Sequence, residues 1–196
     1  MDQSETLRQG VWQAYSAVAR APEAEHPFAV GRAFAEGIGY SAELLADLPA
    51  VTVESFTGVS NVAVFAELPP GARVLDLGCG AGLDALLAAR RVGAGGAVVG
   101  IDFSAAMLAR ARQGAGEAQL GHASFCQGDA EALPLASQSI DVALVNGIFN
   151  LNPGRQAIFA ELARVVRPGG SVFAAELILR EPLPAGDNPS LEDWFA

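Results

Sequence analysis

Residues 74–84 read VLDLGCGAGLD, an apolar run that breaks into a glycine-rich loop and restarts as a helical pattern. Glycine lets the backbone approach a ligand closely, and the N-terminus of a helix carries positive potential. The segment therefore indicates the first strand and loop of a nucleotide-binding βαβ unit, and an adenosine-bearing cofactor fits it. An ordinary strand-to-helix turn is the competing interpretation, because a glycine loop alone is a weak signal.

A carboxylate follows at the distance that ribose recognition needs. Asp102 ends the next apolar run about 20 positions after Gly82, where it can accept hydrogen bonds from both ribose hydroxyls. Nicotinamide dinucleotide sites share this spacing, but their fingerprint needs glycine where the chain has Leu83. Asp76, inside the first strand, would repel a pyrophosphate and attract an amino group. We therefore expect a cofactor that carries an ammonium group, and an NAD-binding oxidoreductase is the alternative.

The pattern on either side of this segment predicts an α/β fold with a helical N-terminal segment. Residues 1–68 show helical spacing of Leu7, Val11, Tyr15 and Val18 and no clear strand, and Ser41 could cap a short helix. After the turn at 69–71, short apolar runs alternate with helical stretches, which is typical of βαβ units and a parallel sheet. We expect a domain boundary there, dividing the chain into 1–68 and 69–196.

Individual elements of the second part can be placed by their caps and turns. The expected strands are residues 73–77, 97–102, 122–127, 140–146 and 171–177. The expected helices are residues 83–92, a helix capped by Ser104, and a helix beginning at Asn152-Pro153. Ile158, Phe159, Leu162, Val165 and Val166 form one apolar stripe on that last helix. These elements predict a doubly wound sheet of strand order 3-2-1-4-5.

Composition excludes several classes of partner. Twelve basic and 22 acidic residues give a net charge of −10, which would repel a phosphate backbone, so we expect no nucleic-acid partner. The chain is 51% hydrophobic and 17% charged, with no charge-free run of eighteen apolar residues, so we expect no membrane partner. The acidic start of the chain argues against a secretory leader and for the cytoplasm. Cys79 and Cys126 are too far apart to form a CxxC or zinc motif, and we expect no metal.

The chain resembles the class I S-adenosylmethionine-dependent methyltransferases in an ordered set of motifs: LDLGCGAG at 75–82, VGID at 99–102, GDA at 128–130, DVA at 141–143 and LARVVRPGG at 162–170. The resemblance covers about residues 70–178. It implies a Rossmann-like fold, S-adenosylmethionine as cofactor and S-adenosylhomocysteine as its product. The cofactor-binding residues that it implies are Asp76, Gly78, Cys79, Gly80 and Gly82 for the methionine part, Asp102 for the ribose, Phe103 and Met107 for the adenine faces, Asp129 and Ala130 for the adenine edge, and Asn146 and Gly147 beside the transferred methyl.

A narrower resemblance links the chain to the arsenite methyltransferases and their relatives. It rests on GYS at 39–41, ESFTGVSN at 54–61 and VNGIFNL at 145–151. That family binds arsenic through thiolates, and this sequence has Val59 and Gly147 where the family motifs carry two of them. A soft metalloid needs soft ligands, so arsenite is not expected as the substrate. We expect instead a small, partly apolar acceptor in a pocket walled by Phe56, Val59, Ile148 and Phe149.

The sequence offers no clear general base. Methyl transfer from a sulfonium is an in-line displacement that positioning alone can accelerate, so a base is optional. His26 and His122 lie away from the expected strand ends, which leaves Tyr15, Tyr40 and Asn146 as catalytic candidates. The alternative function is a non-catalytic S-adenosylmethionine-binding or scaffolding protein.

The resemblance also implies antiparallel strands after the fifth strand, for which the sequence shows no pattern. An edge strand without a neighbour invites a partner. We therefore expect residues 182–196, with Leu191, Trp194 and Phe195 at helical spacing, to pack on the fifth strand, or a homodimer to cover it.

Overall fold

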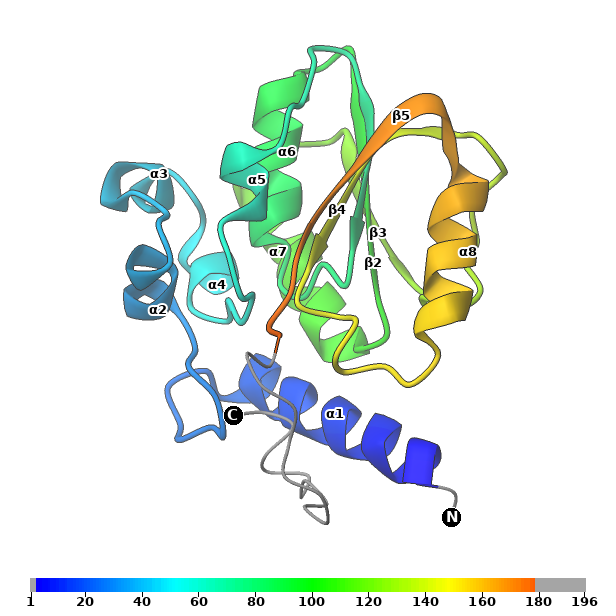
Figure 1. Cartoon of the computed structure of the whole chain (residues 1–196). Coiled ribbons are helices and arrows are strands. Elements are labelled where there is room, and N and C mark those ends of the chain that lie inside the picture. The colour runs from blue at the N-terminus through cyan, green and yellow to red at the C-terminus, as the bar shows by residue number, and fades with distance from the viewer. Residues whose placement is uncertain (1–2, 179–196) are drawn as a thin grey trace.

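The computed structural model describes residues 3–178 (Figure 1). Five helices come first, and five strands then alternate with three further helices. In chain order the elements are α1 (Gln3–Arg20), α2 (Arg32–Gly37), α3 (Ala42–Ala46), α4 (Ala50–Val53), α5 (Val62–Phe65), β1 (Arg73–Leu77), α6 (Leu83–Val92), β2 (Ala97–Asp102), α7 (Ala105–Glu117), β3 (Ala123–Gln127), β4 (Ile140–Asn146), α8 (Arg155–Val165) and β5 (Val166–Ala175).

The five strands form one parallel sheet in the order β3-β2-β1-β4-β5, which confirms the predicted doubly wound fold. Asp76 of β1 is paired with Gly100 of β2 on one side and Leu144 of β4 on the other. The chain therefore leaves β1 in one direction and β4 in the other, which makes the carboxyl ends of these two strands the topological switch point. Ligands of open α/β sheets bind at this position.

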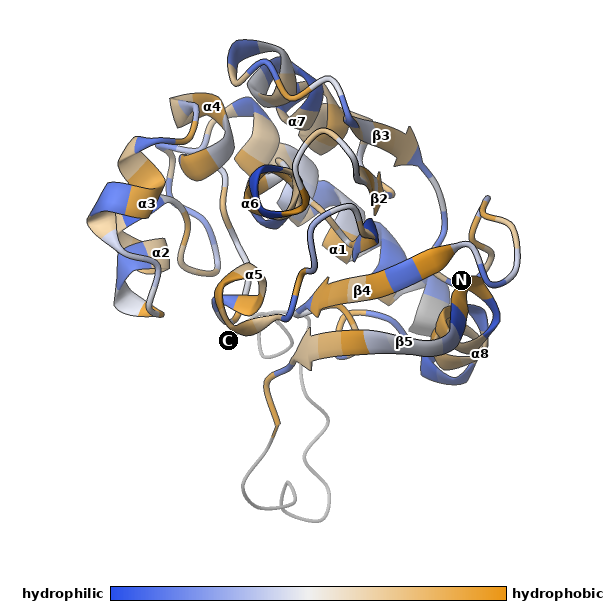
Figure 2. Ribbon diagram, turned by 90° about the horizontal axis from the view of Figure 1, so that it is seen from above, coloured by the Kyte–Doolittle hydropathy of each residue, from blue (hydrophilic) through white to orange (hydrophobic). Residues whose placement is uncertain are grey.

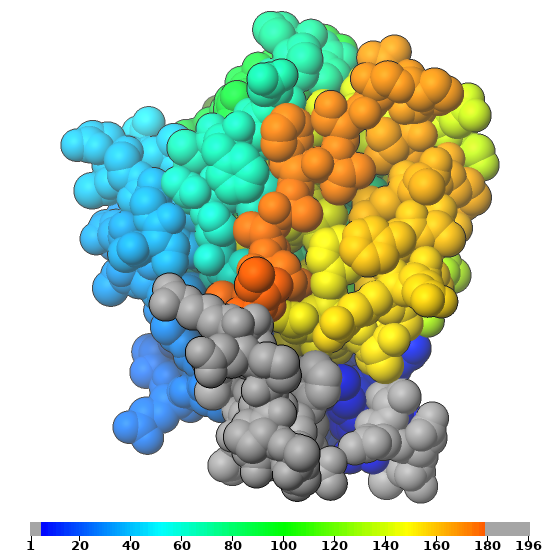
Figure 3. All heavy atoms as spheres, in the orientation of Figure 1, coloured from blue at the N-terminus to red at the C-terminus, as the bar shows by residue number. Residues whose placement is uncertain are grey.

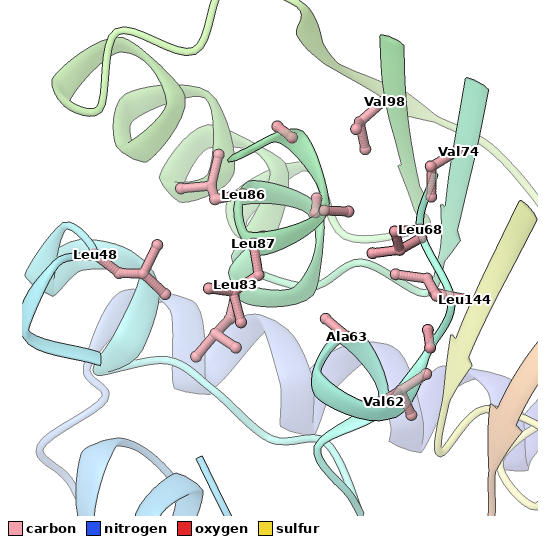
Figure 4. Close-up of a cluster of buried hydrophobic side chains, with 14 of the residues drawn as sticks. Leu48, Val62, Ala63, Leu68, Val74, Leu83, Leu86, Leu87, Val98 and Leu144 are labelled. Atoms are coloured by element: carbon pink, nitrogen blue, oxygen red, sulfur yellow. The ribbon is translucent and has the colours of Figure 1, made fainter. Parts of the chain in front are cut away.

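Each face of the sheet has its own apolar core. Leu83, Leu86 and Leu87 of α6 belong to one buried cluster with Val74 of β1 and Val62 of α5, and Leu86 lies on the side of α6 that faces away from the strands (Figure 4). Helix α8 covers the opposite face, where Ile158, Leu162 and Val165 pack on the other side of β1 and β4. Seen from above, β4 and β5 lie side by side, with α6 and α7 on one side and α8 on the other (Figure 2). The alternating side-chain directions of each strand therefore supply both cores.

Helix α1 lies across the carboxyl ends of the strands, whereas α5 lies beside α6 (Figure 1). In α1, Leu7, Val11 and Val18 are buried, as the helical spacing predicts. Ser41 and Ser104 cap α3 and α7 as predicted, because their hydroxyls accept hydrogen bonds from the N–H groups of Leu44 and Met107. Residues of α3, α4 and α5 share one apolar core with α6. The division of the chain at residue 69 stays a prediction.

The third strand begins at residue 123 instead of 122, and the fifth ends at 175 instead of 177. The two larger differences from the predicted boundaries both lie next to a turn. Helix α8 begins at Arg155, because Asn152 accepts a hydrogen bond from the N–H of Gly154 at 2.7 Å and forms a turn before the helix. Val166 starts β5 instead of ending α8. It pairs with Ile140 and Ser171 pairs with Val142, so residues 167–170 form an irregularity in the strand. The regular part of β5 begins at Ser171, as predicted.

The predicted stripe on α8 is also narrower than expected. Phe159 is 55% exposed, and its ring stacks on that of Phe149 with centroids 4.7 Å apart. Ile158, Leu162 and Val165 are buried and carry the contact with the sheet. The stripe therefore consists of these three residues.

Among residues 3–178, β5 pairs with β4 alone. The surface view shows β5 at the front of the molecule between α5 and α8 (Figure 3). Val172 and Ala174 line a hollow of about 490 Å³ between β5 and α8. The expected packing of residues 182–196 on β5 lies outside the described residues. Within residues 3–178 no helix has both the length and the apolar composition needed to cross a bilayer.

Candidate functional site

A cavity lies at the switch point, between the sheet and the N-terminal segment. Its walls come from α1, from residues 52–58, from the β1–α6 loop, from the end of β2 and from the loop that follows β4. It has about 60 Å³ of room for water-sized molecules, whereas ligand sites typically offer roughly 300–1,000 Å³. Its walls must therefore move apart to admit a nucleoside-sized ligand. Two larger hollows lie at the edges of the sheet, away from the glycine loop.

The predicted cofactor residues divide into two groups. Those that line the cavity are Asp76, Gly78, Cys79, Gly80, Asp102, Phe103, Asn146 and Gly147. Gly82, Met107, Asp129 and Ala130 lie outside its lining. Met107 is fully buried beside Val18 and Ala81, and an added Cβ on Gly82 would press on Ala111 at 3.0 Å. Both positions serve packing in this structure, and their predicted contacts with the cofactor stay predictions.

Asp129 lies on the surface, near the start of α1. Its side chain is half-exposed, 3.9 Å from the guanidinium of Arg8, and it accepts a hydrogen bond from the N–H of Glu131. Arg8 also forms an ion pair with Glu131. These contacts tie α1, whose Tyr15 lines the cavity, to the loop after β3.

The glycine loop allows close approach but offers few free N–H groups. Gly78 has a φ of +73° and faces Ile148, which a Cβ on Gly78 would strike. The N–H groups of Gly78 and Cys79 bond to the carbonyl of Ile101, and that of Gly80 bonds to Asp102 at 2.8 Å. The glycines therefore shape the cavity wall, while side chains must supply most of its polar contacts.

Three buried carboxylates dominate the electrostatics of the cavity. Asp76 is 2% exposed, and its Oδ2 has no hydrogen-bond partner among the described residues. Burial raises its pKa well above the usual range, and the charges of Asp84 and Asp102 raise it further. Burial also raises the pKa of Asp102 to about 6, although the N–H groups of Ser104 and Gly80 oppose this shift. The lining contains no Lys, Arg or His, so the site favours a cation and disfavours a pyrophosphate.

Asp84 is a cavity residue that the sequence analysis did not identify. Burial raises the pKa of this carboxyl. Its oxygens accept hydrogen bonds from the hydroxyl of Tyr40 and, at 2.9 Å, from the side chain of Asn146. Asp84 lies in α6, Tyr40 in the N-terminal segment and Asn146 at the end of β4, and no spacing in the sequence links the three residues. The network therefore attaches the N-terminal segment to the sheet beneath the cavity.

The catalytic candidates have structural partners. Asn146 accepts hydrogen bonds from the N–H groups of Val59 and Ser60 and donates to the carbonyl of Ser60 and to Asp84, so its amide is fully engaged. Tyr40 lies outside the lining, with its hydroxyl on Asp84. Tyr15 lines the cavity and stacks on Phe28. Burial, followed by nearby negative charges, raises the pKa of both tyrosines, which therefore stay protonated at neutral pH.

The acceptor pocket is walled differently from the prediction. Phe56 and Ile148 line the cavity, whereas Phe149 turns into the core below α8. Val59 lies behind Gly147, where an added Cβ would approach its Cγ1 to 2.8 Å. The two positions at which the resemblance implies thiolates are thus neighbours, filled by a valine and a glycine.

We expect Tyr40→Phe to lower the free energy of unfolding by about 1–3 kcal/mol, because it removes a donor from the buried Asp84 carboxyl. Chemical denaturation of the variant and the parent measures the change. Tyr15→Phe is the matched control, because its ring contacts with Phe28 would persist. Equal stability of Tyr40→Phe and the parent would contradict the role of Tyr40 in attaching the N-terminal segment.

Comparison with known proteins gives concordant results. A family model described as a methyltransferase domain matches residues 68–196. An arsenite methyltransferase of Halobacterium salinarum is 37% identical over 149 residues, which cover 76% of this chain and 38% of that protein. A 2-phytyl-1,4-naphtoquinone methyltransferase of Thermosynechococcus vestitus is 45% identical over 105 residues, which cover 53% of this chain and 45% of that protein. The chain thus spans less than half of the length of either relative.

Among solved structures, an arsenic(III) S-adenosylmethionine methyltransferase of Chlamydomonas reinhardtii matches with a TM-score of 0.67 and 34% sequence identity. The match covers 72% of this chain and 50% of that one. It therefore includes part of the N-terminal segment as well as the sheet.

Proposed function

The chain belongs to the methyltransferase domain family, and from this premise we propose that it transfers a methyl group from S-adenosylmethionine to a small, partly apolar acceptor. S-adenosylmethionine is the cofactor of this class of enzyme. The observation that carries the proposal is the unpartnered Oδ2 of Asp76 in a cavity that contains three carboxylates and no cationic side chain. An ammonium group on the ligand would satisfy this oxygen.

The remaining cavity residues suit the other parts of the cofactor. Asp102 lies at the end of β2, where ribose hydroxyls can donate to it, and the ring of Phe103 lines the cavity beside it. Gly78 and Gly147 line the cavity at the ends of β1 and β4, where they lie close to Ile148 and Val59. When bound, S-adenosylmethionine supplies an electrophilic methyl group on a positively charged sulfur.

The proposed acceptor follows from the walls and from the groups that could take a proton. Phe56, Ile148 and Leu151 provide an apolar wall near the end of β4. Tyr15 stays protonated, and Asn146 has no free polar atom. Among the described lining residues, only the buried carboxylates could therefore act as a base at neutral pH. The lining would act on the acceptor mainly by positioning it. An acceptor whose attacking atom is already nucleophilic fits such a site.

The proposal excludes arsenite bound through a set of thiolates. Cys79 is the one cysteine in the described lining, and burial raises the pKa of its thiol well above the usual range. Cys126 lies on β3, outside the cavity. A screen of methyl transfer to thiols, amines, quinols and arsenite tests the proposal, with turnover expected for an organic acceptor. Robust turnover of arsenite would contradict the argument. Cofactor binding without turnover of any acceptor would favour the non-catalytic alternative.

A further inference from the structure

Three buried side-chain oxygens in residues 3–178 have no hydrogen-bond partner within the protein: Thr52 Oγ1, Ser55 Oγ and Asp76 Oδ2. All three residues line the same cavity. Buried polar groups are nearly always paired, because an unpaired one keeps its full cost of desolvation. One cavity is thus lined by three residues that each carry an unpaired buried oxygen, which indicates that a ligand supplies the missing partners. An ammonium group on the ligand would pair with Asp76, which leaves the hydroxyls of Thr52 and Ser55 without a partner.

The two hydroxyls occupy one place in the fold. Thr52 is in α4 and Ser55 follows one helical turn later, with 0% and 1% of their surfaces exposed. The oxygen of Thr52 lies against Gly114 of α7, where a Cβ would collide with it. Leu83, the first residue of α6, lines the same cavity. A helix N-terminus carries a partial positive charge, which adds to the attraction for an anion.

The chemistry of the ligand indicates which of its groups the two hydroxyls bind. In an amino acid, the ammonium and the carboxylate are attached to the same carbon, so a ligand whose ammonium faces Asp76 carries an anion next to it. Asp76, Asp84 and Asp102 would repel that anion, and the lining contains no Lys, Arg or His to neutralise it. Neutral donors must therefore hold it. Thr52 and Ser55 are buried donors in the lining with no other partner.

We propose that the hydroxyls of Thr52 and Ser55 bind the carboxylate at the amino-acid end of the cofactor. This inference rests on the proposed function, because it takes S-adenosylmethionine as the ligand. A carboxylate on the acceptor is the other possible source of the same anion. The two sources differ in which ligand loses affinity when the hydroxyls are removed.

The test is calorimetric titration of the full chain and of the variants Ser55→Ala and Thr52→Val with two ligands. S-adenosylmethionine has the carboxylate, and decarboxylated S-adenosylmethionine lacks it but keeps the ammonium, sulfonium and adenosine. Each variant is expected to lower the affinity for S-adenosylmethionine about tenfold, because hydrogen bonds to charged groups are among the stronger ones. The affinity for the decarboxylated ligand is expected to stay unchanged. Ser124→Ala is the matched control, because that hydroxyl bonds to the carbonyl of Val98 outside the cavity.

The stability of the ligand-free protein gives an independent result. Thr52→Val replaces an unpaired buried hydroxyl by a methyl group of similar size, so its melting temperature is expected to rise by about 2–4 °C. A purely structural role for the hydroxyl would instead lower the melting temperature.

Several outcomes would overturn the inference. In the two variants, an equal loss of affinity for both ligands would do so, and so would unchanged affinity for both. A rise in the KM of an acceptor with unchanged cofactor affinity would assign the hydroxyls to the acceptor instead. Failure of the unmodified chain to bind S-adenosylmethionine would refute the proposed function itself. The behaviour of the parent chain therefore separates the two failures.

Discussion

Replacing Asp76 by asparagine is expected to weaken the binding of S-adenosylmethionine about 100-fold, or about 2.7 kcal/mol. The Asp76 carboxylate accepts a hydrogen bond from the backbone of Ala85, and its Oδ2 has no partner. Asparagine can keep the bond from Ala85 through its amide oxygen, but it removes the charge opposite the ligand's ammonium. Loss of one partner from a buried charge pair costs about 2–5 kcal/mol.

Titration calorimetry of Asp76→Asn with S-adenosylmethionine and S-adenosylhomocysteine measures the effect on both forms of the cofactor. Asp47→Asn is the matched control, because it removes one exposed negative charge at the end of α3, outside the cavity lining. The thermal stability of ligand-free Asp76→Asn is expected to rise, because the substitution removes a buried and partly unpaired carboxyl. Unchanged affinity would remove the assignment of Asp76 to the ammonium group.

The sheet could be predicted from the sequence because its signals are local. Short apolar runs, the caps Ser41 and Ser104 and the glycine loop each act within a few residues, and the doubly wound rule converts their order into a topology. The boundaries near Asn152 and Val166 could not be predicted in the same way. They depend on an Asn turn and on the pairing of Ile140 with Val166 across an irregular strand.

Only those residues of the candidate site that are marked by their local position in the sequence could be predicted. Asp76 is marked by its place in the first strand just before the glycine loop, and Asp102 by its place at the end of the second strand. Asp84 resembles any acidic residue in the first turn of a helix, and its partners Tyr40 and Asn146 are brought to it only by folding. Ser55 has no distinctive spacing at all. Its signal is a buried hydroxyl without a partner, and such a signal exists only in three dimensions.

Met107 shows an ambiguity that spacing leaves open. It lies on the inner face of α7, close in sequence to Asp102, and that position suits both an adenine contact and a core contact. The structure places it at 0% exposure beside Val18 of α1. Helix α1 buries this residue by packing on α7, and the periodicity of α7 alone does not indicate that another helix packs there.

The carboxylates predict a second large effect: the ligand-free protein should lose stability as pH rises. Burial raises the pKa of Asp102 to about 6 in the folded protein, whereas its ordinary value is 3.8, so between these pH values the folded state binds more protons than the unfolded state. The free energy of unfolding therefore falls as pH rises, by ~3 kcal/mol for this group at about 1.4 kcal/mol per pKa unit. The raised pKa values of Asp76 and Asp84 act in the same direction.

Thermal unfolding between pH 4 and pH 8 measures this loss, which we expect to be smaller in Asp76→Asn. A cationic ligand favours the ionised carboxylates, so its binding should release protons and become tighter as pH rises through the same range. Titrations at pH 6 in buffers of different ionisation enthalpy would detect that release as a buffer-dependent heat. Stability that increases from pH 5 to pH 8, or a binding heat that is the same in every buffer, would show that the three carboxylates are already ionised before the ligand arrives.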